Sequence, residues 1–115
     1  MCIRDSLEHR SSLSELSKEE WDDFRRLVRK LENAYQKALG AGPFNWSCLM
    51  NNAYKEKPYN PHVHWHLIPR YEKPVTINDT ILIDEEFGHM FAPKKERIVD
   101  ERIVEEIAEK IRTFL

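Results

Sequence analysis

The feature that most constrains the fold is a short run, residues 62–68 (HVHWHLI), in which histidine alternates with apolar residues. Successive side chains of a β-strand point to opposite faces, so the three imidazoles share one face and lie roughly 6–7 Å apart along the chain. The apolar residues between them occupy the other face. The run therefore predicts a strand with one histidine face and one face directed into a core.

Three interpretations of this histidine face are open, because packing has no use for three side chains that titrate near neutral pH. In the first, a neutral imidazole attacks phosphorus while a neighbouring group fixes its tautomer and nearby donors neutralise phosphate charge. In the second, the three histidines ligate zinc, although alternate residues on a flat strand diverge too little to surround one ion well. In the third, they are incidental polar residues on a solvated sheet face.

A long helix is predicted ahead of this strand. Ser17 and Glu20 have the spacing of a capping box at a helix N-terminus. Apolar residues then recur at steps of three and four, which lays one apolar stripe along the helix. These residues are Trp21, Phe24, Val28, Leu31, Tyr35 and Ala38. Gly40 and Gly42-Pro43 end the helix, and we interpret the stripe as core packing.

The remaining elements indicate an α+β fold. Residues 44–50 alternate like a strand, and the turn-rich loop 51–61 is short enough to join them to the histidine strand as an antiparallel pair. Two short strand pieces, 76–77 and 81–83, are separated by Asn78-Asp79. A final helix is predicted from Asp100 to Phe114. The expected architecture is an antiparallel sheet with a long central helix and a C-terminal helix.

Composition narrows the class of protein. The chain has 115 residues, which predicts a single domain over 1–115. Its 18 basic and 20 acidic residues give a net charge of −2, so no bulk positive field is available to bind nucleic acid. We expect no membrane helix and no signal peptide. Cys2 and Cys48 cannot build a disulfide framework, which favours a reducing cytoplasmic location.

Residues 62–70 (HVHWHLIPR) resemble the signature of the histidine triad (HIT) family, in which three histidines alternate with apolar residues and Pro-Arg often follows. Residues 7–20 resemble the segment of that family that carries an upstream histidine before the first helix. Asn51 lies eleven residues before the first histidine of the motif, as in the family. The resemblance covers roughly residues 7–72 and implies a HIT-like fold and a homodimer.

The resemblance also implies an activity. Family members are nucleotide hydrolases or nucleotidyltransferases that act at the α-phosphorus of nucleoside phosphates, phosphoramidates or dinucleoside polyphosphates. The middle histidine of the motif, His64, would be the nucleophile and would form a covalent nucleotidyl-histidine intermediate. His62 would orient His64, and His66 would contact phosphate oxygens. His9 matches the family's histidine that packs behind the triad. The alternative interpretation is that His9 is a surface loop residue.

The substrate-binding assignments are implied by the same resemblance. Asn51 would contact the ribose or the phosphate, and a polar cap at a strand end is its alternative interpretation. Many family members carry a Gly-Gln-Ser/Thr stretch before the triad that contacts the leaving group, whereas this chain has residues 57–61 (KPYNP) there. Asn60 is a candidate substitute donor, and Lys57 a candidate partner for polyphosphate charge.

We expect no bound metal or other cofactor, with Mg²⁺ accompanying a polyphosphate substrate. Two alternative functions remain, a zinc-dependent hydrolase that uses the three histidines as ligands and a non-catalytic nucleotide-binding protein. The first six residues, MCIRDS, resemble a peptide translated from sequencing-adapter DNA. This resemblance suggests that residues 1–6 are not native and that N-terminal strands of the family fold are missing.

Overall fold

The computed structural model describes the backbone of residues 2–5 and all atoms of residues 8–92 and 99–115. Two compact units are distinguished by their internal contacts. The first unit consists of residues 1–29 and 44–68, and the second of residues 30–43 and 69–115. The predicted catalytic and substrate-binding residues all belong to the first unit.

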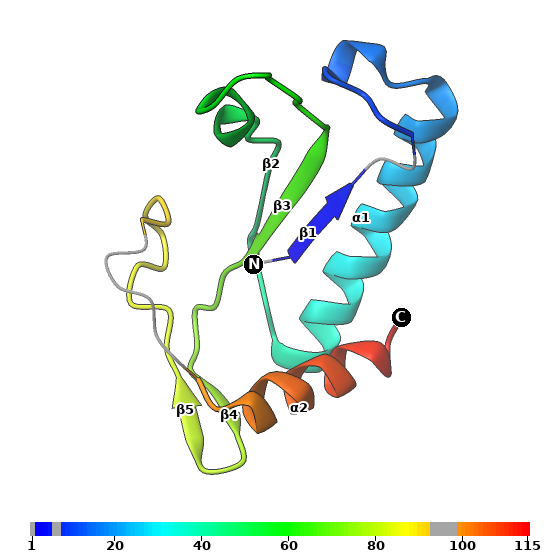
Figure 1. Cartoon of the computed structure of the whole chain (residues 1–115). Helices are drawn as coiled ribbons and strands as arrows, with labels where there is room; N and C mark the ends of the chain where they lie inside the picture. Colours follow the sequence, from blue (N-terminus) through cyan, green and yellow to red (C-terminus); the bar gives the residue numbers. More distant parts are fainter. Residues whose placement is uncertain (1, 6–7, 93–98) are drawn as a thin grey trace. The chain divides into compact units, whose positions relative to one another are not determined.

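The first unit is built on a three-stranded sheet in the order β1-β3-β2 (Figure 1). Its strands are β1 (Cys2–Asp5), β2 (Phe44–Ser47) and β3 (His64–Pro69). Strand β1 runs antiparallel to β3, with Asp5 opposite His64. The sequence pattern did not predict β1, because this four-residue segment shows no clear alternation and owes its conformation to pairing with β3.

Helix α1 (Lys18–Leu39) begins at the predicted capping box. The Ser17 N–H donates to Glu20 Oε2 at 2.8 Å, and the Glu20 N–H donates to Ser17 Oγ at 3.2 Å. The Phe24 ring stacks on Trp65 of β3 with centroids 4.0 Å apart. Trp65 therefore packs against α1, whereas Trp21 remains 42% exposed, so the apolar stripe is buried only in part.

The second unit begins within α1, which ends where Gly40 adopts a φ of +69°. The Gly40 N–H donates to the Gln36 carbonyl at 2.9 Å, which closes the last turn. Strands β4 (Val75–Ile77) and β5 (Thr80–Leu82) form an antiparallel hairpin across Asn78-Asp79, with Asn78 at a φ of 50°. Helix α2 (Glu101–Arg112) begins at Asp100, whose side chain accepts from the Arg102 N–H. Among the residues of this unit that the structure describes, the buried apolar ones are Ala34, Ala41, Ile77, Ile103 and Ile111.

The structure confirms the α+β class, the antiparallel strands, the long helix and the C-terminal helix, and corrects several boundaries. The histidine strand begins at His64, two residues later than predicted, because the Val63 N–H donates to the Arg10 carbonyl at 2.8 Å. Strand β2 covers 44–47 of the predicted 44–50. The predicted loop 51–61 opens with a 3₁₀ turn, η2 (Asn51–Tyr54), and another, η1 (Leu13–Glu15), precedes α1.

Two further expectations bear on the ends of the chain and on membranes. Residues 1 and 6, which belong to the segment interpreted as non-native, lie outside the described residues. Within the described part of the chain, no helix is both long enough and apolar enough to cross a membrane.

Candidate active site

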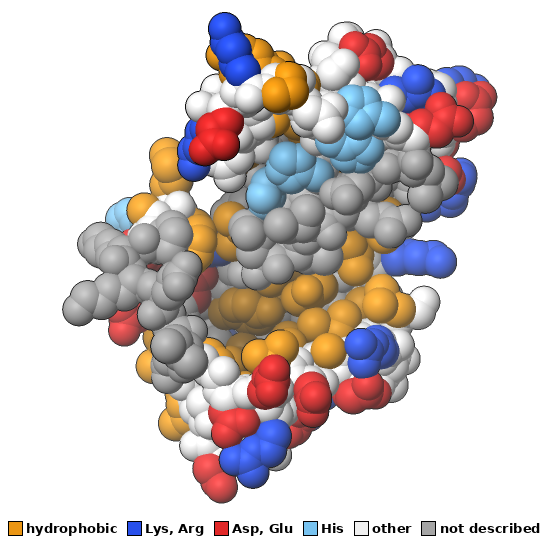
Figure 2. Space-filling view, in the orientation of Figure 1, with side chains coloured by type: hydrophobic (Ala, Val, Ile, Leu, Met, Phe, Trp, Pro, Cys, Tyr) orange, Lys and Arg blue, Asp and Glu red, His pale blue; other side chains and the backbone are white. Residues whose placement is uncertain are grey.

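The alternation along β3 and the residue before it gives this segment two chemically different faces. The side chains of Leu67 in β3 and of Val63, which directly precedes it, are fully buried. The rings of His64 and His66 lie next to each other, with centroids 4.9 Å apart and planes inclined by 68°. Figure 2 shows histidine side chains gathered over the region where β3 begins. The buried apolar residues fix the strand and thereby set the direction of the imidazoles.

The side chain of the second histidine of the motif is hydrogen-bonded to the backbone of the first. His64 Nδ1 lies 2.8 Å from the carbonyl oxygen of His62. A carbonyl oxygen only accepts hydrogen bonds, so Nδ1 of His64 carries the proton, and in the neutral ring the lone pair lies on Nε2. This bond fixes both the tautomer and the orientation of the His64 ring.

His9 lies beside the first histidine of the motif. The ring centroids of His9 and His62 are 5.0 Å apart, with the planes tilted by 53°. The backbone hydrogen bond from the Val63 N–H to the Arg10 carbonyl links the segment that carries His9 to the start of the histidine motif. The structure thus brings the four predicted catalytic histidines into two neighbouring ring pairs, His9 with His62 and His64 with His66.

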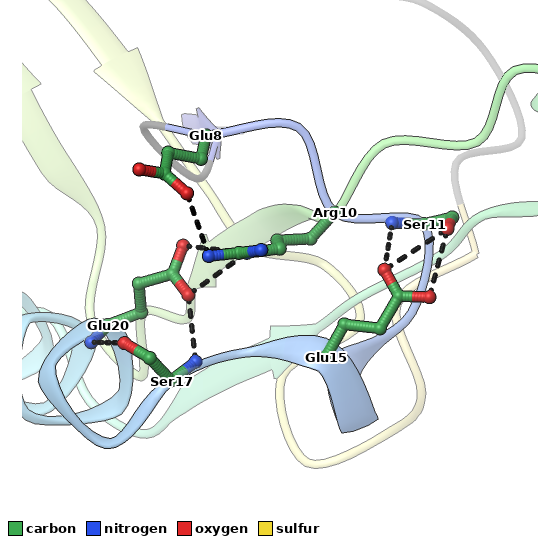
Figure 3. Close-up of polar contacts among 6 residues, drawn as sticks. All are labelled: Glu8, Arg10, Ser11, Glu15, Ser17 and Glu20. Carbon is green, nitrogen blue, oxygen red and sulfur yellow. Dashed lines mark hydrogen bonds and ion pairs between the residues drawn. The ribbon is translucent and has the colours of Figure 1, made fainter.

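A charged network connects the segment that carries His9 to the start of α1 (Figure 3). Arg10 Nε donates to Glu20 Oε2 at 3.2 Å, and Arg10 Nη2 donates to Glu8 Oε2 at 2.8 Å. Glu20 is also the acceptor of the capping box with Ser17. One carboxylate therefore caps the helix and holds the arginine next to His9. Sequence reasoning identified Glu20 only as a capping residue.

The pKa of His66 gives a pH-dependent test of this geometry. Burial lowers the pKa of His66 below its ordinary value near 6.5, and the charge of His64 lowers it further. We expect the imidazole NMR signals of His66 to titrate below pH 6.5 in the native protein. In a His64→Ala variant the midpoint should rise part of the way, because the charge is removed while the burial remains. A His89→Ala variant should leave it unchanged, and a His66 midpoint at or above 6.5 would contradict the described burial.

Among the described residues, no group of three or more His, Cys, Asp or Glu side chains is placed to hold a metal ion. The His62 ring neighbours His9, whereas the His64 ring neighbours His66. One His64 nitrogen is also engaged with a carbonyl oxygen.

The predicted substrate-binding residues lie on the segment between β2 and β3. Asn51 is the first residue of η2, and Lys57 and Asn60 follow in the loop. All three are exposed. Their roles remain predictions. Tyr54 and Tyr59 lie on the same segment, and their ring centroids are 5.3 Å apart.

A shallow groove lies along the first half of α1. It is lined by Trp21, Asp22, Phe24, Arg25 and Val28. None of the predicted catalytic or substrate-binding residues lines it, so the groove does not contribute to the candidate site.

Arg70, the last residue of the motif, is only 3% exposed and lies in the second unit. Its Nε and Nη2 donate to the two carboxylate oxygens of Asp84 at 2.6 and 2.9 Å. Its remaining N–H groups donate to the carbonyl oxygens of His89, at 2.7 Å, and Glu86. These hydrogen bonds keep the pKa of Asp84 below its usual range. Arg70 thus organises the loop that follows β5.

The fold and the site define an α+β protein with an oriented imidazole on a central strand. The chain is 36% identical over 63 residues to adenosine 5'-monophosphoramidase hnt1 of Schizosaccharomyces pombe. The match covers 55% of this chain and 43% of that relative, so the chain matches less than half of the relative's length. This similarity confirms the resemblance to the histidine triad family. No protein-family model and no solved structure matches the chain.

Proposed function

We propose that the protein is a nucleotide hydrolase or nucleotidyltransferase that acts at the α-phosphorus of a nucleoside phosphate, phosphoramidate or dinucleoside polyphosphate, with His64 as the nucleophile. One observation carries this proposal. The bond from His64 Nδ1 to the His62 carbonyl leaves the lone pair on Nε2, which is the form of imidazole that can attack phosphorus.

In the first step, His64 Nε2 forms a bond to the α-phosphorus while the bond from phosphorus to the leaving group breaks. The bonding electrons depart with the leaving group, which takes up a proton. In the second step, a water oxygen bonds to phosphorus, the P–N bond breaks, and the water gives up a proton. The products are the nucleoside monophosphate and the free imidazole. Two displacements at phosphorus replace one more difficult step.

The neighbouring histidines have separate roles in this proposal. His62 holds the proton on His64 Nδ1 through its carbonyl oxygen. His66, next to His64, contacts phosphate oxygens. His9 packs against the His62 ring and supports its position. Asn51 contacts the ribose or phosphate, and Asn60 and Lys57 contact the leaving group.

The relative's name indicates the first substrate to test, adenosine 5'-phosphoramidate. We expect the protein, dialysed against a chelator, to release AMP from this compound. Quenching at alkaline pH preserves a phosphorus–nitrogen bond, so intact-mass measurement should show a protein species heavier by one adenylyl group. Peptide mapping should place that group on His64.

Other outcomes would replace the proposal by a named alternative. Activity that disappears with the chelator and returns with stoichiometric zinc would establish a zinc hydrolase. Binding of AMP without any release of AMP from the phosphoramidate would establish a nucleotide-binding protein without turnover. An adenylyl group mapped to another residue would refute the role of His64.

A further inference from the structure

One peptide group, between His62 and Val63, is hydrogen-bonded at both of its ends. Its carbonyl oxygen lies 2.8 Å from His64 Nδ1, and its N–H donates to the Arg10 carbonyl at 2.8 Å. A peptide group is planar and rigid, so a contact that fixes its N–H also fixes the direction of its carbonyl. The bond that sets the tautomer of His64 therefore depends on where the Arg10 backbone lies.

The two hydrogen bonds of this peptide group also strengthen each other. When a peptide N–H donates a hydrogen bond, the carbonyl oxygen of the same group becomes more negative and a better acceptor. The Arg10 carbonyl thereby strengthens the bond between the His62 carbonyl and His64 Nδ1. The peptide group connects Arg10 to the candidate nucleophile over two hydrogen bonds.

The side chain of Arg10 is anchored to helix α1. Its Nε donates at 3.2 Å to Glu20 Oε2, in the first turn of the helix (Figure 3). The two side chains are 30% and 19% exposed, so water screens this ion pair less than a surface pair. Glu8 also pairs with Arg10, but it is 73% exposed and only two residues away. The pair with Glu20 therefore fixes the segment to the helix, whereas the pair with Glu8 lies within the segment.

A second contact supports the same placement. The His9 ring lies beside the His62 ring, with centroids 5.0 Å apart. Residues 9 and 10 thus hold residues 62 and 63, one through the rings and the other through the backbone. Two adjacent contacts resist rotation of the segment about either of them.

We propose that Arg10, anchored by Glu20, is a positioning residue that holds the peptide group between His62 and Val63 and thereby keeps the proton on His64 Nδ1. For its effect on catalysis, this inference rests on the proposed function. Loss of the anchor weakens the bond from the peptide N–H to the Arg10 carbonyl, and with it the bond to His64. Part of the neutral His64 then carries its proton on Nε2, which leaves that nitrogen without a lone pair to attack phosphorus.

Two NMR measurements test the positioning without any substrate. The ¹⁵N shifts of the His64 ring give the fraction of each tautomer at about pH 9, where histidine side chains are neutral. The exchange rate of the Val63 amide reports its bond to Arg10. In Arg10→Met we expect the Nε2–H tautomer to appear and the Val63 amide to exchange about tenfold faster or more. Both changes should be smaller in Arg10→Lys, because an ammonium still pairs with Glu20.

Glu20→Gln and Glu8→Gln make the same chemical change in the two partners of Arg10. A glutamine at position 20 still accepts from the Ser17 N–H, so the capping box is kept. We expect Glu20→Gln to change the tautomer and the amide exchange in the same direction as Arg10→Met, and Glu8→Gln to leave both at their native values. If Glu20→Gln changes them no more than Glu8→Gln, the proposed anchor is wrong.

Ser17→Ala separates positioning from stability. It removes the hydroxyl that accepts from the Glu20 N–H but keeps the pair between Arg10 and Glu20. We expect this variant to unfold at a lower urea concentration and to keep the native tautomer of His64. If it changes the tautomer as much as Arg10→Met does, the effect is general destabilisation and the proposal falls.

Turnover of adenosine 5'-phosphoramidate measures the effect on catalysis. In Arg10→Met, kcat should fall about tenfold or more while KM stays within about threefold, because the substrate still binds but the imidazole is misdirected. A native tautomer in both Arg10→Met and Glu20→Gln would overturn the proposal. If the native protein turns over no nucleotide, the proposed function fails, and the tautomer measurements still decide the positioning role.

Discussion

The His64→Ala variant is expected to lose turnover of adenosine 5'-phosphoramidate while it keeps its fold. Without the imidazole there is no nitrogen to form the covalent intermediate, and the two-step route closes. We expect kcat/KM to fall on the order of a thousandfold or more, as when a nucleophile is removed from other enzymes. Initial rates of AMP release by the native and variant proteins measure this difference.

The control for this variant is His89→Ala, which removes an imidazole from an exposed loop of the other unit. No described contact joins its side chain to the four histidines of the candidate site, and its carbonyl oxygen remains available to Arg70. This variant should keep native activity. A fold check by circular dichroism accompanies both variants, because His64 also contacts His66. A correctly folded His64→Ala protein with more than about a tenth of native activity would contradict the nucleophilic role.

The Arg70→Met variant is expected to give the largest loss of stability. Asp84 is paired with Arg70 and is itself largely buried, so removing the guanidinium leaves a carboxylate that water barely reaches. Breaking one side of such a pair costs about 3–5 kcal/mol. Urea unfolding at neutral pH measures the change in the free energy of unfolding.

Arg102→Met provides the matched comparison, because Arg102 is paired with Asp100 on the surface and its side chain is 85% exposed. An exposed pair of this kind contributes about 0–1 kcal/mol. Converting Asp84 to asparagine in the Arg70→Met background should recover part of the loss, since the unpaired charge then disappears. If Arg70→Met costs no more than Arg102→Met, the buried pair does not have the role that its geometry indicates.

The pH dependence of this loss follows from Asp84. Its pKa is lowered in the folded protein, chiefly by the hydrogen bonds from Arg70. A lowered carboxyl pKa contributes stability above the unfolded-state value, and this contribution is lost as the pH falls through the lowered folded value. The difference in stability between the native protein and Arg70→Met should therefore shrink in acid.

Features decided by neighbouring residues could be predicted from the sequence. Ser17 and Glu20 sit in one helical turn, and the described structure has their capping box. The alternation that directs Val63 and Leu67 into the core is a property of the strand itself. The hairpin around Asn78 follows from a turn-forming pair between two short apolar runs.

Features decided by distant partners could not be predicted in this way. Strand β1 exists because β3 offers it an edge to pair with. Strand β3 begins two residues later than predicted because the Val63 N–H makes a backbone hydrogen bond to the Arg10 carbonyl, and these two residues are far apart in the sequence. Arg70 and Asp84 are fourteen residues apart, and nothing local marks them as partners. The resemblance to a family predicted a role for the histidines, and the structure added which of their rings are neighbours.

The double engagement of Glu20 has a consequence for how the protein tolerates mutation. Its carboxylate accepts from the Ser17 backbone and from the Arg10 guanidinium at once. Its neighbour Glu19 is exposed on the first turn of the same helix. Random sequence change should therefore be accepted far more readily at position 19 than at position 20, although both carry the same amino acid. A substitution at position 20 disturbs helix initiation and histidine placement together, so no single compensating change can restore both.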